Sequence, residues 1–176
     1  MEFRVVDFEK ITHHYKLYQD GIQKIEDYKD EIIKKVDPIR KQMQNILSAA
    51  NNGIVIDNLS EQQRMQKFQS LQQELLAVDK EAKIKITEMR DELNKEVYSN
   101  LEKIISNWSE QNNIDVVIGK LEVVYVSNKY ESTEDVLDLL KASGDFIEEQ
   151  ETVEYKGELE KENKKQNPEF IIKEEN

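Results

Sequence analysis

The chain has 176 residues, of which 35% are charged and 38% are hydrophobic, and its formal net charge is −12. This length fits a single domain, and the absence of cysteine excludes a disulfide framework, a thiol nucleophile and a cysteine-based zinc site. The acidic excess repels phosphate backbones, so nucleic acid is not an expected partner.

A short strand and then a long helix open the predicted structure. Residues 3–7 are rich in aromatic and β-branched side chains, as strands are. After them, apolar positions follow one another by steps of four and three, with a mean of about 3.5 residues, the spacing of a coiled-coil seam. Pro38 predicts a kink near residues 34–37, and Gly21 predicts a second soft point on the polar side of this helix. Only Lys29 interrupts the apolar stripe, which consists of Ile11, Tyr15, Tyr18, Ile22, Ile25, Lys29, Ile32, Val36, Ile39, Met43 and Ile46.

A second long helix is predicted after a link of about ten residues. Residues 49–53 are small or tolerate the left-handed conformation, and so end the first helix. Ser60 with Gln63 has the spacing of a capping box, and Asn58 with Glu61 is the alternative cap. A mean apolar step of about 3.64 predicts less supercoiling than in the first helix. This second stripe consists of Phe68, Leu71, Leu75, Val78, Ala82, Ile86, Met89, Leu93, Val97, Leu101, Ile104 and Trp108.

The short link requires the two helices to turn back on each other, which predicts an antiparallel hairpin arm over residues 8–113. Pairing about the link places Ile32 near Val78 and Ile25 near Ile86. The second helix is the longer one, so it should extend past the first at the open end of the hairpin.

Two β-rich runs follow the hairpin, at residues 114–118 and 121–126, and the link Gly119-Lys120 between them predicts a β-hairpin. Ser132 then caps a short helix over residues 133–143, which Gly144 ends. The sequence therefore predicts a mainly α fold with a small base of three strands at the hairpin's open end.

The last part of the chain differs in composition. Residues 148–176 hold 10 Glu against 5 Lys and few apolar side chains, which predicts a disordered acidic tail after a domain at residues 1–147. The arm, by contrast, is nearly neutral, with 18 acidic and 16 basic residues over 8–113.

Three short strands and one helix cannot bury a core alone, so the base is expected to oligomerise. The residues expected to form this oligomeric base are Val5, Val6, Val116, Val117, Ile118, Val123, Val124 and Tyr125. At the far tip, Ile54, Val55 and Ile56 form an apolar cluster with little core to cover it. They either fold back over the last helical turns or contact clients or a neighbouring arm.

The sequence resembles the Skp/OmpH periplasmic chaperones over roughly residues 3–142. The first strand carries part of the resemblance, at residues 3–8 (FRVVDF), together with the charged hairpin. Its most specific part begins at residues 113–118 (NIDVVI) and continues through 123–127 (VVYVS) and 132–137 (STEDVL). The chain differs from the best-known members in being acidic rather than basic and in its acidic tail.

This resemblance implies a homotrimer in which strands of the three chains form a central barrel and three hairpin arms enclose a cavity. It also implies a holdase that keeps unfolded outer-membrane proteins in that cavity without ATP. A prefoldin-like arrangement fits less well, because there the strands lie between the helices, whereas here they flank the hairpin.

No feature of the sequence indicates catalysis, a cofactor or a metal. His13 and His14 are adjacent, so on a helix they point about 100° apart and cannot chelate one metal together. Carboxylate pairs such as Asp91 with Glu92 belong to a solvated helix face, and Trp108 completes an apolar stripe. No glycine-rich phosphate loop or nucleophile-base set is present.

Two functions are therefore considered, neither of them enzymatic. The first is an ATP-independent holdase that binds unfolded proteins, and the second is a structural spacer or scaffold built on the same hairpin. No stretch approaches the ~20 apolar residues of a membrane span. No signal peptide opens the sequence, which predicts a cytoplasmic protein as written, or a periplasmic one if this is a mature form.

Overall fold

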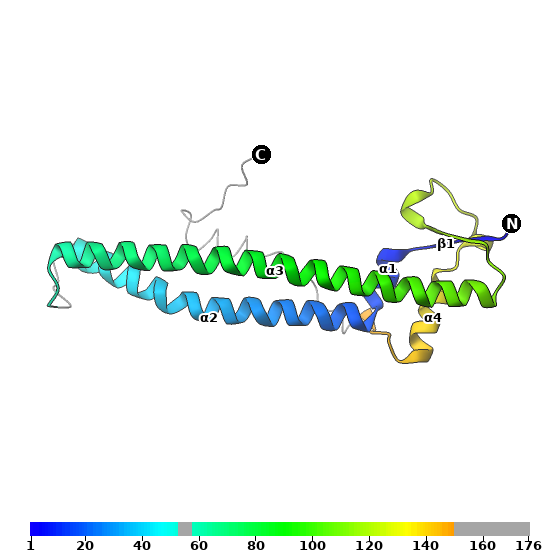
Figure 1. Ribbon diagram of the computed structural model, residues 1–176, viewed down its shortest axis with the longest axis horizontal. Coiled ribbons are helices and arrows are strands. Elements are labelled where there is room, and N and C mark those ends of the chain that lie inside the picture. Colours follow the sequence, from blue (N-terminus) through cyan, green and yellow to red (C-terminus); the bar gives the residue numbers. More distant parts are fainter. Residues whose placement is uncertain (53–57, 150–176) are drawn as a thin grey trace.

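The computed structural model describes residues 1–52 and 58–149, which form a long helical hairpin on a compact base (Figure 1). Helix α2 (Lys16–Asn52) leads away from the base, and helix α3 (Glu61–Gln111) returns beside it. α3 continues past the start of α2 into the base, as the unequal stripes predicted. The predicted class, mainly α with a small β base, is confirmed.

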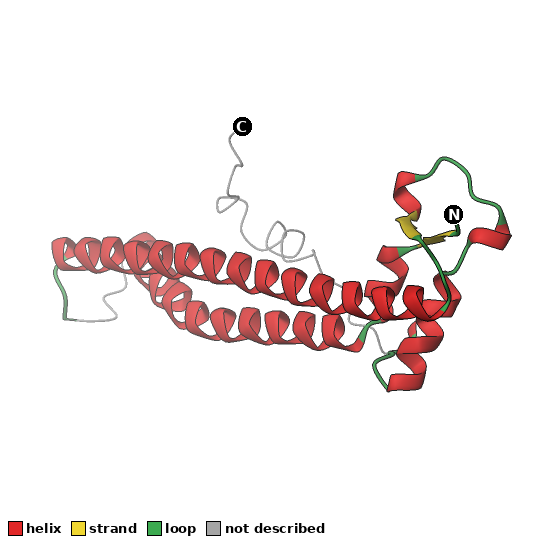
Figure 2. Cartoon of the chain, turned by 45° about the vertical axis from the view of Figure 1, so that its right-hand side comes forward, coloured by secondary structure: helices red, strands yellow, loops and turns green. Residues whose placement is uncertain are grey.

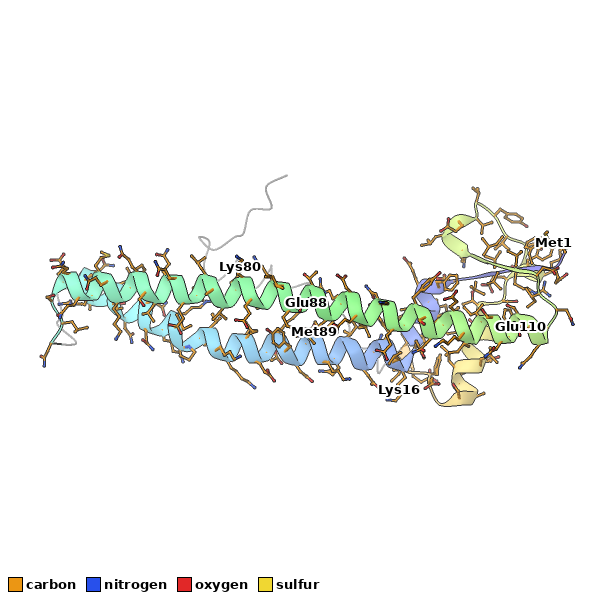
Figure 3. All side chains as sticks on the ribbon, viewed as in Figure 1. Met1, Lys16, Lys80, Glu88, Met89 and Glu110 are labelled. Carbon is orange, nitrogen blue, oxygen red and sulfur yellow. The ribbon has the colours of Figure 1, made fainter. Side chains whose placement is uncertain are left out.

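Most positions of the two predicted stripes lie in the seam between α2 and α3, whereas Ile11, in α1, and Tyr15, between α1 and α2, lie in the base. Every stripe position is buried or half-buried. Figure 3 shows Met89 between the two helices and Lys80 on the outer side of α3. The buried residues divide into a base-side cluster, which includes Ile11, Ile22, Ile25, Leu93, Val97 and Leu140, and a distal cluster of Val36, Ile39, Met43, Leu71 and Leu75.

The expected register of the hairpin agrees with these clusters. Ile86 packs against the base-side cluster, which contains Ile25, whereas Ile32 and Val78 both pack against the distal cluster. Lys29 lies at the seam with a relative exposure of only 7%. Its Nζ donates a hydrogen bond to Glu26 Oε1 at 2.6 Å, which offsets part of the cost of burying an ammonium group.

Gly21 and Pro38 behave differently in α2. The prediction for Gly21 was wrong, because a Cβ built there would lie 2.2 Å from Leu93 Cδ1 of α3. Gly21 thus lets the helices approach closely and is not a soft point on a polar face. α2 continues as one helix through Pro38, and Figure 1 shows it changing direction in its light-blue section.

The first helix breaks near the base, which the sequence did not predict. Helix α1 (Phe8–His14) ends at Tyr15, whose backbone is extended with φ −77° and ψ 119°. Residues 145–147 pair with the break: the Lys16 N–H donates to Asp145 O at 2.7 Å, and the Ile147 N–H donates to His14 O at 2.9 Å. These bonds satisfy backbone groups that the interrupted helix leaves free.

The distal end of α3 begins as predicted. Ser60 is its N-cap, with the Gln63 N–H donating to Ser60 Oγ at 3.2 Å and the Ser60 N–H donating to Gln63 Oε1 at 2.9 Å. Both halves of a capping box are therefore present, and the alternative cap at Asn58 is not used.

The base sheet has two described strands rather than three. β1 (Phe3–Val6) pairs in parallel with β2 (Val116–Gly119), with Phe3 opposite Val116 and Val6 opposite Gly119. The predicted strand over residues 121–126 was wrong: a 3₁₀ turn, η1 (Lys120–Glu122), follows β2, and the chain then loops away (Figure 2). The β-hairpin about Gly119-Lys120 is therefore not formed. High β propensity does not produce a strand unless a partner strand is present.

Helix α4 (Thr133–Ser143) closes the base over the predicted residues, after a second 3₁₀ turn, η2 (Asn128–Tyr130). Ser132 is its N-cap residue, but the Ser132 side chain makes no capping hydrogen bond, so that part of the prediction was wrong. Gly144 ends it in the left-handed conformation with φ 78°. Val136, Leu137 and Leu140 are buried and Leu139 is half-buried. They pack β1, α1 and α3 into one core.

Candidate interaction surfaces

An apolar groove of about 670 Å³ lies at the base between α1, α3 and the end of β2. Its walls include Phe8 of α1, Val97, Leu101 and Ile105 of α3, and Val116 of β2. The groove lies where α3 extends past α2 and packs instead against the short α1, the sheet and α4.

Charged side chains around this groove are mostly acidic. Glu9, Glu102, Asp115 and Glu122 line it, against the single base Lys120. An apolar floor with a negative rim favours a neutral or basic polypeptide over an acidic one.

An exposed apolar run lies beside the groove. Leu121, Val124 and Tyr125 have relative exposures of 79%, 108% and 82%, and Leu121 also lines the groove. Soluble monomers seldom expose such a run unless it is an interaction site. β1 pairs with one edge of β2, and in the described part of the chain no strand pairs with its other edge. The base therefore offers a strand edge and apolar surface that another polypeptide can cover.

The residues predicted to form the oligomeric base fall into two groups. Val5 and Val6 have exposures of 1% and 0%, so they belong to the chain's own core. The others keep some accessible surface: Val117, Ile118 and Val123 are half-buried, and Val116, Val124 and Tyr125 are exposed. The predicted tip residues Ile54, Val55 and Ile56 lie outside the described residues.

The base carries one ion pair that ties α1 to α4. Lys10 Nζ donates to Glu134 Oε1 at 2.6 Å. This hydrogen bond raises the pKa of Lys10 and lowers the pKa of Glu134 from their ordinary values. Both side chains are largely exposed, so the pair orients α4 more than it stabilises the base.

The two histidines have structural roles. His14 stacks on Phe146 with ring centroids 5.0 Å apart, and its Nδ1 lies 2.8 Å from Ile147 O. His13 and His14 meet edge to face. Among residues 1–52 and 58–149, no three His, Asp or Glu side chains are grouped so as to hold a metal ion.

Sequence reasoning missed both the groove and the contribution of Tyr98, which is 68% exposed and lines it. Tyr98 directly follows the seam residue Val97, and a tyrosine so close to a seam is a signal that could have been read. The pairing of residues 145–147 with the helix break has no comparable signal, because the apolar period runs through Tyr15 without interruption.

No described helix is long and apolar enough to cross a membrane. The described molecule is thus a base with an unpaired strand edge and one projecting coiled-coil arm. This arrangement defines the structural class, a coiled-coil hairpin on a small β-containing base.

The comparisons identify the family within that class. The sequence model of the family described as outer membrane protein (OmpH-like) matches residues 2–140. This match covers most of the chain, and the protein therefore belongs to the OmpH-like family. The comparison with curated proteins gives no significant match.

A solved structure shares the fold. It is the crystal structure of a protein from Caulobacter crescentus CB15 that has been proposed to be an OmpH-like outer membrane chaperone. The two chains are 11% identical, with a TM-score of 0.63, and the similarity covers 83% of this chain and 87% of the other. At this identity the likeness extends to the fold alone.

Proposed function

We propose that this protein is a non-enzymatic holdase that assembles as a trimer through its base and holds unfolded proteins between the arms. Membership of the OmpH-like family supports a chaperone role. The observation that carries the assembly is the exposed run Leu121, Val124 and Tyr125 beside the free edge of β2. The family match also supports a periplasmic location.

The base explains why more than one copy is needed. When a second chain supplies a strand, the unpaired backbone groups of the β2 edge form hydrogen bonds with it, and the apolar surface beside the edge becomes buried. The groove beside it is large enough for several apolar side chains from that chain. If each of three chains pairs its strand edge with the next chain around one axis, the sheets close into a barrel and leave no free edge.

The arms explain the holding. One hairpin buries a single stripe and encloses nothing, whereas three arms rising from one base border a shared space. The near balance of 18 acidic and 16 basic residues over 8–113 argues against a strongly charged lining. Client capture should therefore be mainly apolar and weakly dependent on salt.

Assembly can be tested at a site that leaves the monomer's core intact. Val117 packs against the base-side cluster, so Val117→Asp would damage the chain's own core as well. Val124 is fully exposed, so Val124→Asp should dissociate the trimer while helicity stays unchanged. Light scattering at micromolar concentration measures the mass, and a monomeric parent would contradict the proposal.

Holding is tested by aggregation suppression without nucleotide. The parent should keep an unfolded β-barrel client soluble, and a cytosolic client measures how selective it is. Loss of protection in Val124→Asp would tie holding to assembly. If the parent assembles but protects neither client, the result would favour the structural spacer or scaffold function over the holdase function.

A further inference from the structure

The groove at the base lies beside a sheet edge that has no partner in the described part of the chain. An extended peptide can add a strand to such an edge and place alternate side chains in a pocket beside it. The described residues end at Glu149, and residues 150–176 follow them in the sequence. The chain therefore contains polypeptide of its own that is a candidate occupant of the groove.

The described part of the chain ends close to the groove. The Ile147 N–H donates a hydrogen bond to His14 O at 2.9 Å, at the end of α1. Thr12, two residues earlier in α1, lines the groove. An extended chain spans about 3.3–3.6 Å per residue, so the residues between Glu149 and Phe170 can cover up to about 70 Å. Chain length therefore does not prevent the C-terminal residues from reaching the groove of their own chain.

The apolar side chains of residues 148–176 fall into two groups. The first is interrupted by charged residues and a glycine, and consists of Val153, Tyr155 and Leu159. The second is continuous, and consists of Phe170, Ile171 and Ile172. In an extended chain, residues two apart face the same side. Phe170 and Ile172 can therefore enter one pocket together, and Val153 and Tyr155 have the same spacing.

Charge distinguishes the two groups. The first lies in residues 148–160, which carry six Glu and one Lys. The second lies in residues 161–176, which carry four Glu and four Lys. The rim of the groove is acidic, with Glu9, Glu102, Asp115 and Glu122 against Lys120. This rim repels the strongly acidic stretch and does not repel the balanced one, so the second group suits the groove better.

We propose that Phe170 and Ile172 of the same chain occupy the base groove, and that they must leave it before a second copy can bind there. The second half of this inference rests on the proposed assembly through the base, which uses the same groove. The C-terminal residues then shield the apolar surface of a single chain and compete with its partner. Assembly is thereby restrained until the concentration of the protein is high enough to displace them.

This competition requires only weak binding, because the occupant is tethered to the groove. A segment on a short tether has an effective concentration on the order of 1 mM. With a dissociation constant of about 0.1 mM, such a segment leaves the groove free in about one chain in ten. The apparent affinity of a partner copy for the groove falls by the same factor.

A matched pair of double variants of the full chain tests the competition. Phe170→Ser with Ile172→Ser removes the two side chains proposed to enter the groove. Val153→Ser with Tyr155→Ser removes two side chains of the same spacing from the acidic stretch. Light scattering over a dilution series gives the concentration at which each variant assembles. We expect the first variant to assemble at a concentration about tenfold or more below that of the parent, and the second within about twofold of it.

A photo-crosslinker tests the contact itself, at a concentration where the full chain is monomeric. Placed at position 171, between the two proposed anchors, it should join to groove residues of the same chain such as Tyr98 and Leu121, which are exposed. Placed at position 159, it should not. Crosslinks from position 171 only to other parts of the chain, or only to a second copy, would overturn the assignment.

The two experiments separate this inference from the proposed function. If both double variants assemble as the parent does, the competition is refuted and the proposed trimer stands. If neither the parent nor the variants assemble at any concentration, the proposed trimer is refuted, and the crosslink from position 171 alone decides whether the groove is occupied by its own chain.

Discussion

The base and the distal arm differ in how completely their apolar side chains are buried. In the base, Val6, Ile11, Val136 and Leu140 are completely shielded, because β1, α1, α3 and α4 cover them from several directions. In the distal arm, the five residues of the distal cluster each keep 6–8% of their surface exposed, because only two helices meet there. Figure 1 shows this contrast as a compact end and a bare two-helix ribbon.

This contrast separates two mechanical roles. A base that shields its core can hold a fixed shape and serve as a platform for assembly. A ribbon held by one apolar stripe is expected to have a lower local unfolding free energy than the base. Lys29, buried at the seam beside Glu26, marks the border between the two clusters.

The largest expected effect lies in the base. Leu140→Ala should cost about 3 kcal/mol of unfolding free energy, because a fully enclosed leucine leaves a cavity. Leu71→Ala in the distal cluster should cost about 1–2 kcal/mol, because the open ribbon can relax around it. Urea unfolding of both variants gives the two values, and equal losses would remove the contrast.

The next largest loss of unfolding free energy is expected at Gly21, where α2 and α3 approach closely. Gly21→Val should cost about 1–3 kcal/mol, because the new side chain collides with Leu93 in the base-side cluster. Leu93→Ala should recover part of that loss in the double variant, giving a favourable coupling energy in thermal unfolding. Additive losses would mean that the two residues do not compete for the same space.

A smaller and more local effect is expected at the far end of the arm. Ser60→Ala removes the side-chain half of the capping box and should cost about 1 kcal/mol. The loss should appear in hydrogen exchange as fraying of the first turns of α3, with the base amides unchanged. Weakened protection throughout the base would show that the arm and base unfold as one unit.

The smallest effect concerns the Lys10–Glu134 pair. The pKa of Glu134 is lowered in the folded chain, so its stabilisation is present at neutral pH and is lost as the pH falls through that lowered pKa. Since both side chains are exposed, the loss should be only about 0.2–0.5 kcal/mol. Glu134→Gln should lack this part of the acid dependence in urea titrations at pH 7 and pH 3.

The hairpin could be predicted from the sequence because its signal is periodic. Stripes at regular spacing fix which faces meet, and the cap at Ser60 follows from the residues alone. The strand over residues 121–126 could not be judged in this way, since its β propensity does not say whether a partner strand lies in the same chain. The break at Tyr15 was missed because it depends on Asp145 and Ile147, which are distant in sequence.

The candidate site was predicted only in outline. Val124 and Tyr125 were expected at an oligomeric base, and the structure leaves them exposed beside the free edge of β2. The groove needs α1, α3 and β2 to meet, and no local pattern encodes that meeting. The prediction for Gly21 failed because helix phase alone does not reveal how closely two helices approach.

Native mass spectrometry of the complex with an unfolded β-barrel client tests the central claim most directly. The full chain is mixed with the urea-unfolded client, diluted without nucleotide, and weighed. We expect a complex of three copies of this chain with one client. A monomer under these conditions, or a trimer that carries no client, would contradict the proposal that the base assembles so that the arms can hold unfolded protein.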